Sequence, residues 1–72
     1  MTPSANDNAP RLMAPKDAAL ATSLSRTLLA LMADAGEFPA PVRLGERRVA
    51  YVRAEVDAWI DQRIGSRQAR AA

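Results

Sequence analysis

GEFPAPVRLGERRVAYVRAEVDAWI, residues 36–60, is the stretch that decides the fold of this chain. Gly36 is expected to end a helix, and the two prolines that follow force the backbone into an extended path. Two short runs of β-type residues come next, at 42–44 and 49–52, on either side of a turn at Gly45. The pattern predicts a β-hairpin that leads directly into an amphipathic helix with the only tryptophan of the chain.

That last helix has a single apolar stripe. Val56, Trp59, Ile60 and Ile64 fall at positions i, i+3, i+4 and i+8, which lie on one face of an α-helix. We expect the stripe to pack against the rest of the domain, with Trp59 in the core rather than stacked on a nucleic-acid base. Gly65 is expected to end the helix.

Two further helices are predicted before the hairpin. Pro15 suits a first turn, so residues 15–21 are expected to form a short helix. Ser25 is a good N-cap for a second helix that runs to Ala35. Two helices joined by a few residues and followed by a hairpin and another helix give a mainly α fold with a small β-hairpin. This order is that of a winged helix-turn-helix, in which the second helix is the recognition helix.

Composition excludes most kinds of chemistry. The chain has 72 residues with no cysteine and no histidine, so it lacks thiol chemistry, the usual general base and the commonest metal ligands. No nucleophile has a base at a suitable spacing. We therefore expect no enzyme activity, no cofactor and no metal site.

The chain divides into three parts. Residues 1–10 are polar and rich in turn formers, which predicts a disordered arm, and residues 65–72 are expected to form a short basic tail. The folded domain is expected at 11–64. Since no apolar stretch approaches the roughly 18 residues of a membrane span and the start lacks a signal-peptide core, we expect a soluble, cytoplasmic protein of the bacterial nucleoid.

The first turn of the second helix is a candidate DNA contact. Ser25, Arg26 and Thr27 stand where recognition helices meet base edges and where free backbone N–H groups favour phosphate. For Ser25, capping the helix is the main expected role, and a phosphate contact is compatible with it.

Tyr51 lies at the joint between hairpin and last helix and is expected in the core.

The basic residues are concentrated in the hairpin. The net charge is only +2, but all of the ten basic residues except Lys16 are arginine, the residue best suited to bidentate phosphate contacts. Arg47 and Arg48 at the hairpin tip can enter a minor groove or clamp its phosphates. Arg43 and Arg53 are expected to clamp the backbone, with Arg53 alternatively supporting the start of the last helix.

Leu28 and Leu31 make the second helix apolar most of the way round. Leu24, Leu29 and Met32 already supply one apolar face, and a domain this small cannot easily bury a second one. Two explanations stay open at this point. Either the core-facing side of the helix is slightly rotated, or Leu28 and Leu31 form a self-association surface.

The ordered set LSR (24–26), AGEFP (35–39), PVRLG (41–45), RVAY (48–51) and EVDAW (55–59) resembles the AlpA family of phage and mobile-element DNA-binding proteins. The resemblance spans residues 11–64. It implies a MerR-like winged helix-turn-helix and a role as a transcriptional regulator or as an excisionase, also called a recombination directionality factor, similar to the RdfS type. Such factors bend DNA so that an integrase, a tyrosine or serine recombinase, can excise the element.

One departure from the family pattern concerns the recognition helix. Where members usually have Tyr and Arg, this chain has Ala30 and Leu31, and Leu28 replaces a small polar residue. Direct base readout is therefore expected from the first turn only. The expected function is architectural binding of double-stranded DNA by several cooperating copies. The alternatives are a purely transcriptional regulator, and an antitoxin-like or adaptor protein that binds another protein through the apolar helix.

Overall fold

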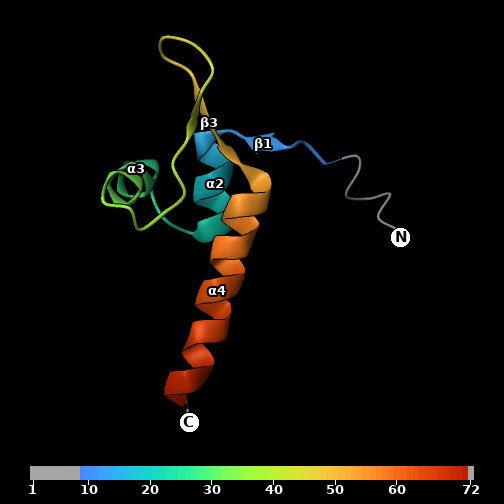
Figure 1. The fold of residues 1–72 in the computed structure, drawn as a ribbon, viewed down its shortest axis with the longest axis vertical. Helices are drawn as coiled ribbons and strands as arrows, with labels where there is room; N and C mark the ends of the chain where they lie inside the picture. Colours follow the sequence, from blue (N-terminus) through green and yellow to red (C-terminus); the bar gives the residue numbers. More distant parts are fainter. Residues whose placement is uncertain (1–8, 72) are drawn as a thin grey trace.

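The computed structural model describes the backbone of residues 9–71 and the side chains of residues 9–67, so most of the predicted arm at 1–10 lies outside the described residues. In this part of the chain, three helices combine with a small antiparallel sheet, whose hairpin projects beyond them (Figure 1). The mainly helical fold with a hairpin, predicted from sequence, is confirmed. In chain order the elements are β1 (Leu12–Met13), α2 (Pro15–Thr22), α3 (Arg26–Asp34), β2 (Val42–Arg43), β3 (Val49–Val52) and α4 (Arg53–Ala71).

The helix-turn-helix is set by local signals at the junction of α2 and α3. Pro15 occupies the first position of α2. Ser23 ends that helix in the left-handed region at φ 66°, and its N–H donates to the carbonyl of Ala19 at 2.8 Å. The hydroxyl of Ser25 then accepts from the N–H of Leu28 at 3.0 Å, which is the predicted N-cap.

A glycine ends α3 as predicted. Gly36 has φ +80°, a conformation that side chains with a Cβ rarely adopt. Its N–H donates to the carbonyl of Ala33 at 3.1 Å, and the N–H of Glu37 donates to that of Met32 at 2.8 Å. This pair of bonds is a Schellman motif, which satisfies the last carbonyls of the helix and turns the chain toward the hairpin.

The sheet has three strands in the order β1–β3–β2, with both pairs antiparallel. The β2–β3 hairpin was predicted, and its register places Arg43 opposite Val49. The strand β1 was not predicted; it pairs Met13 with Tyr51 across a long separation in sequence. Two residues are too few to show an alternating pattern, so only this long-range pairing defines the strand.

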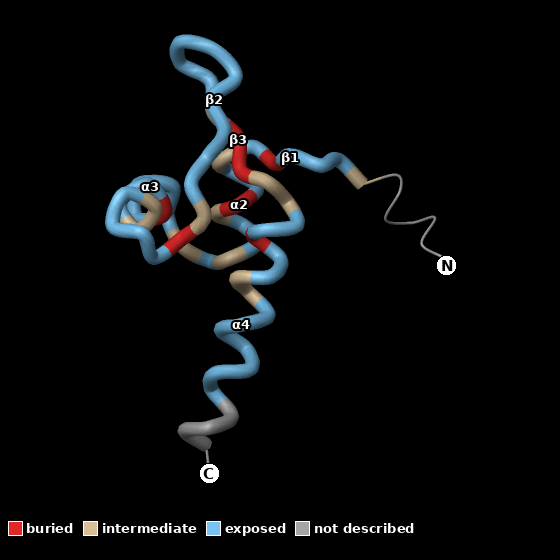
Figure 2. The backbone as a smooth tube through the Cα atoms, in the orientation of Figure 1, coloured by how far each residue is buried: buried red, intermediate tan, exposed pale blue. Residues whose placement is uncertain are grey.

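The core is small and lies where α2, α3 and the start of α4 meet the sheet (Figure 2). Leu29 and Val56 are completely buried. The ring of Phe38, which the sequence did not single out, meets Tyr51 and Trp59 edge-on, with ring centroids 5.3 and 4.9 Å away. The predicted core positions of Tyr51 and Trp59 are therefore confirmed, although Trp59 is only half-buried.

The last helix is longer than predicted and projects away from the rest of the molecule (Figure 1). It passes through Gly65 and reaches Ala71, so the expected end at Gly65 is wrong. A glycine costs only about 1 kcal/mol inside a helix, and the residues after it are compatible with helix. Ile64 is 50% exposed, because the helix has left the core by that point. Among the residues the structure describes, no helix is long and apolar enough to span a membrane.

Candidate nucleic-acid interface

The first turn of α3 presents its side chains and backbone to solvent. Arg26 and Thr27 are both exposed, and Ser25 precedes them as the cap. The hydroxyl of Ser25 is occupied by the N–H of Leu28. The N–H groups of Arg26 and Thr27 have no acceptor within the helix, because the first four N–H groups of an α-helix never do. This end of the helix can therefore accept a phosphate.

The orientation of α3 follows from the burial of Leu29. Successive residues of an α-helix are about 100° apart around its axis, so Thr27 and Leu31 each lie about 160° from Leu29. These two residues form the outer face of the helix. Leu28 lies about 100° from Leu29, on a flank. Leu28 is 41% exposed and Leu31 is 60% exposed, which excludes the explanation that a rotated core buries them.

The β2–β3 hairpin forms a projecting wing, defined here as residues 42–52. The N–H groups of Leu44 and Gly45 both donate to the carbonyl of Arg48, at 2.8 and 3.3 Å, and close the loop at its base. Every residue from Val42 to Arg48 is exposed, including the predicted tip residue Arg47. Arg43, Arg47 and Arg48 thus lie on a hairpin whose loop is held closed by backbone hydrogen bonds.

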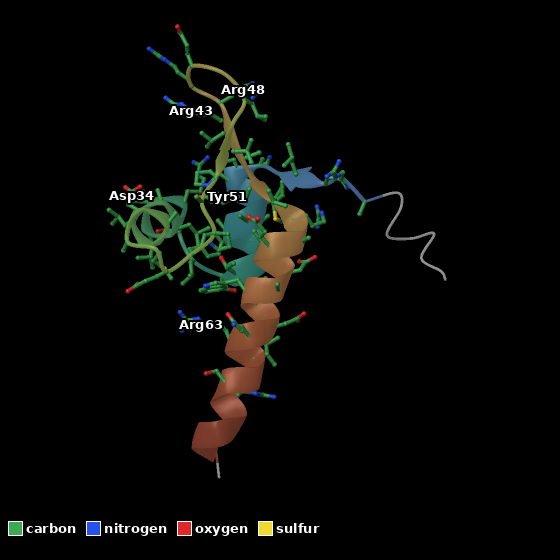
Figure 3. The ribbon with its side chains drawn as sticks, viewed as in Figure 1. Asp34, Arg43, Arg48, Tyr51 and Arg63 are labelled. Carbon is green, nitrogen blue, oxygen red and sulfur yellow. The ribbon has the colours of Figure 1, made fainter. Side chains whose placement is uncertain are left out.

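Arg43 and Arg48 point to opposite sides of the wing. Arg43 pairs with Val49, so the two side chains share one face, while the preceding Arg48 is on the other. Figure 3 shows the two labelled arginines on opposite sides of the hairpin, with Arg43 on the side of α3. A wing with this arrangement can contact phosphates on both walls of a groove.

Arg53 has a structural position. Its Nε donates to the carbonyl of Pro10 at 2.8 Å, and its backbone N–H donates to the carbonyl of Arg11 at the same distance. These bonds connect the segment before β1 to the first turn of α4. Of the two uses predicted for Arg53, the structure therefore supplies contacts for support of the helix start.

A second arginine, Arg63, was not assigned from sequence. Its guanidinium carbon lies 4.8 Å from the centre of the Trp59 ring, a cation–π contact. The indole N–H of Trp59 donates to the carbonyl of Glu37 at 2.9 Å and so joins α4 to the turn after α3. An open groove of about 590 Å³ lies between residues 36–39 and this part of α4. The spacing of Trp59 and Arg63, one helical turn apart, is the signal that would have found the pair.

The phenol of Tyr51, on the wing, is affected by a charge on α3. Burial raises the pKa of the Tyr51 phenol above its usual value of 10.0, and the negative charge of Asp34 raises it further. Asp34 is the last residue of α3 and Tyr51 lies on β3, so this charge couples the end of the helix to the sheet (Figure 3). Within the described residues, no group of three or more His, Cys, Asp or Glu side chains is placed to hold a metal ion.

Comparison with known proteins gives one family and one curated relative. Residues 11–64 match the family described as prophage CP4-57 regulatory protein (AlpA). An uncharacterized protein, ORF88, of Enterobacteria phage P4 is 42% identical over 45 residues, which cover 62% of this chain and 51% of that protein. The chain thus spans about half the length of this relative. No solved structure matches.

Proposed function

The chain belongs to the AlpA family of prophage regulatory proteins, and from this premise we propose that it grips duplex DNA with α3 and the wing together. In this arrangement α3 enters a major groove with its outer face toward the bases, and the wing lies on the adjacent minor groove. The main observation behind the proposal is that the wing is closed by hydrogen bonds at the base of its loop and has exposed arginines on both of its sides.

Each part of the interface has a defined task in this proposal. Arg43 and Arg48 contact phosphates on the two walls of the minor groove, and Arg47 at the tip reaches the groove itself. Ser25, Arg26 and Thr27 hold a phosphate and the nearest base edges at the start of α3. Arg53 contributes indirectly, because its bond to Pro10 joins the segment before β1 to the first turn of α4.

Titration of the full chain with a random-sequence duplex tests this proposal against a role as a protein adaptor. A protein that neutralises phosphates releases counterions, so its affinity falls steeply as salt rises. We expect clear binding at low salt with a linear dependence of log affinity on log salt concentration. Absence of salt-sensitive binding would support the adaptor and would leave the wing arginines without a role.

At the finer level, we propose that the chain is an excisionase, a recombination directionality factor that bends nucleoid DNA beside an integrase. A domain this small makes few base contacts, which suits a role in shaping DNA. Footprinting on the DNA that flanks its own gene separates this role from purely transcriptional regulation. Protection beside a recombinase crossover site, with excision that depends on the chain, is the expected result, and protection confined to a promoter would favour the regulator.

Neighbouring copies are proposed to touch on DNA through apolar surface of α3, where Leu28 and Leu31 are exposed. Leu28 makes this contact in the proposed complex, because a flank of the helix stays accessible when the outer face, with Leu31, enters a groove. Several weak sites can then fill cooperatively, each contact raising the local concentration of the next copy.

A further inference from the structure

The outer face of α3 is apolar at the place where a recognition helix meets the bases. Leu31 is 60% exposed and lies almost opposite the fully buried Leu29. Thr27 lies one turn earlier on the same face and is also exposed. The side chain of Leu31 is exposed to water in the free protein. Its burial against an apolar group of a partner would therefore favour binding.

The surroundings of this face indicate what covers it. Arg26 begins the same helix, and Arg43 stands on the side of the wing that faces α3 (Figure 3). With these two arginines beside an apolar face, the complementary partner has negative charges at its edges and an apolar group between them. A DNA major groove has phosphates along both edges, and its floor carries one apolar group, the C5 methyl of thymine.

We propose that Leu31 and the methyl group of Thr27 read thymine methyls in the major groove. The proposal rests on the proposed DNA-binding function and adds a specificity that the first turn of α3 alone does not supply. Apolar side chains are established partners of the thymine methyl. The two residues are separated by about 6 Å along the helix axis, so the thymines they contact are about two base pairs apart.

Asp34 limits the same surface at its other end. It follows Leu31 by three residues and is exposed. A carboxylate at this position repels phosphate, but it can accept a hydrogen bond from the amino group of a cytosine. The polar groups at the two ends of α3 therefore leave the middle of the helix to apolar contact. Leu20 is even more exposed, at 78%, but it lies on α2 and not on the outer face of α3.

Replacement of thymine by deoxyuridine tests the proposal, since it removes the methyl group and keeps every hydrogen-bonding group. A duplex selected in vitro for binding to the full chain is made with thymine and with deoxyuridine. We expect the parent to bind the deoxyuridine duplex roughly fourfold more weakly for each methyl contacted, from the burial of one methyl-sized group. Leu31→Ala should bind the thymine duplex more weakly than the parent and lose part of this discrimination.

Leu20→Ala is the matched control, because it removes the same atoms from another exposed helix position; it should retain the full discrimination. Equal binding of both duplexes by the parent would overturn the thymine assignment while leaving DNA binding intact. Equal discrimination by the parent and by Leu31→Ala would overturn the role of Leu31 and would leave the effect to Thr27 or to DNA shape. Failure of the parent to bind any duplex at low salt would instead refute the proposed function itself.

Discussion

Trp59 shows how much a single residue contributes in so small a domain. Its indole ring packs edge-on against Phe38, donates to the carbonyl of Glu37 and is covered by Arg63. One side chain therefore joins α4 to the turn that follows α3. The angle between α3 and the wing depends on that joint, because the same turn leads into β2.

Trp59→Ala is expected to lower the free energy of unfolding by about 3 kcal/mol, the lower end of the range for a truncated tryptophan, since the ring is partly exposed. Total stabilities of small domains are only a few kcal/mol, so the thermal transition should become broad or disappear near 37 °C. Circular dichroism melting measures this effect. Leu20→Ala should melt almost like the parent, and a Trp59→Ala variant that does the same would show that the joint is not structural.

Glycine acts in opposite ways just after α3 and within α4. Gly36 adopts a left-handed conformation at the end of α3, whereas Gly65 lies within α4, and a Cβ added at either would meet no other atom within 4 Å. Gly36→Ala should destabilise the domain by about 1 kcal/mol through backbone strain alone. Gly65→Ala should instead raise helicity, because alanine favours the helix by up to about 1 kcal/mol.

Denaturant melts measure the first effect and far-ultraviolet circular dichroism the second. The Gly65 gain should appear in helicity rather than in the global transition, because residues 61–67 are all exposed and make no part of the core. Unchanged stability of Gly36→Ala would contradict the role given to the Schellman motif. Reduced helicity of Gly65→Ala would mean that α4 ends where the sequence first suggested.

At the level of elements, the sequence predicted the helix ends and the turn that depend on neighbouring residues. Ser25 and Gly36 defined the ends of α3, and the β-type runs around Gly45 defined the hairpin. Strand β1 and the buried ring of Phe38 depend on partners distant in sequence, which no local pattern reveals.

For the candidate site, the sequence predicted the exposed arginines of the wing, but it could not choose the outward side of α3. That helix is apolar over most of its circumference, so periodicity alone does not fix its rotation. The position of Leu29 in the folded core settles the question and places Leu31 outward. Arg53 shows the same limit, because its bond to Pro10 exists only once β1 has paired with β3.

The flank of α3 gives a prediction about assembly. Leu28→Gln should leave affinity for a single site nearly unchanged, while a fragment with several adjacent sites should fill independently rather than cooperatively. Gel shifts on one-site and multi-site fragments measure the difference. Independent filling by the parent would show that the chain works as a solitary binder.

At the scale of the whole molecule, a very small core holds both parts of the proposed DNA interface, α3 and the wing. The wing is braced by its own hydrogen bonds and by the three-stranded sheet, and α3 is fixed by Leu29 and the turn at Gly36. Meanwhile α4 projects away from both (Figure 1). The central claim is that the arginines of the wing contact phosphates.

The salt dependence of duplex binding by Arg47→Ala/Arg48→Ala tests that claim most directly. Each phosphate contact that is lost should reduce the slope of log affinity against log salt by roughly 0.9, so the double variant should lose up to about 1.8 and bind all duplexes more weakly by a similar factor. Arg67→Ala, which removes an exposed arginine from the projecting part of α4, is the control and should keep the parental slope. A double variant with the parental slope would contradict the account, because the wing would then make no phosphate contact.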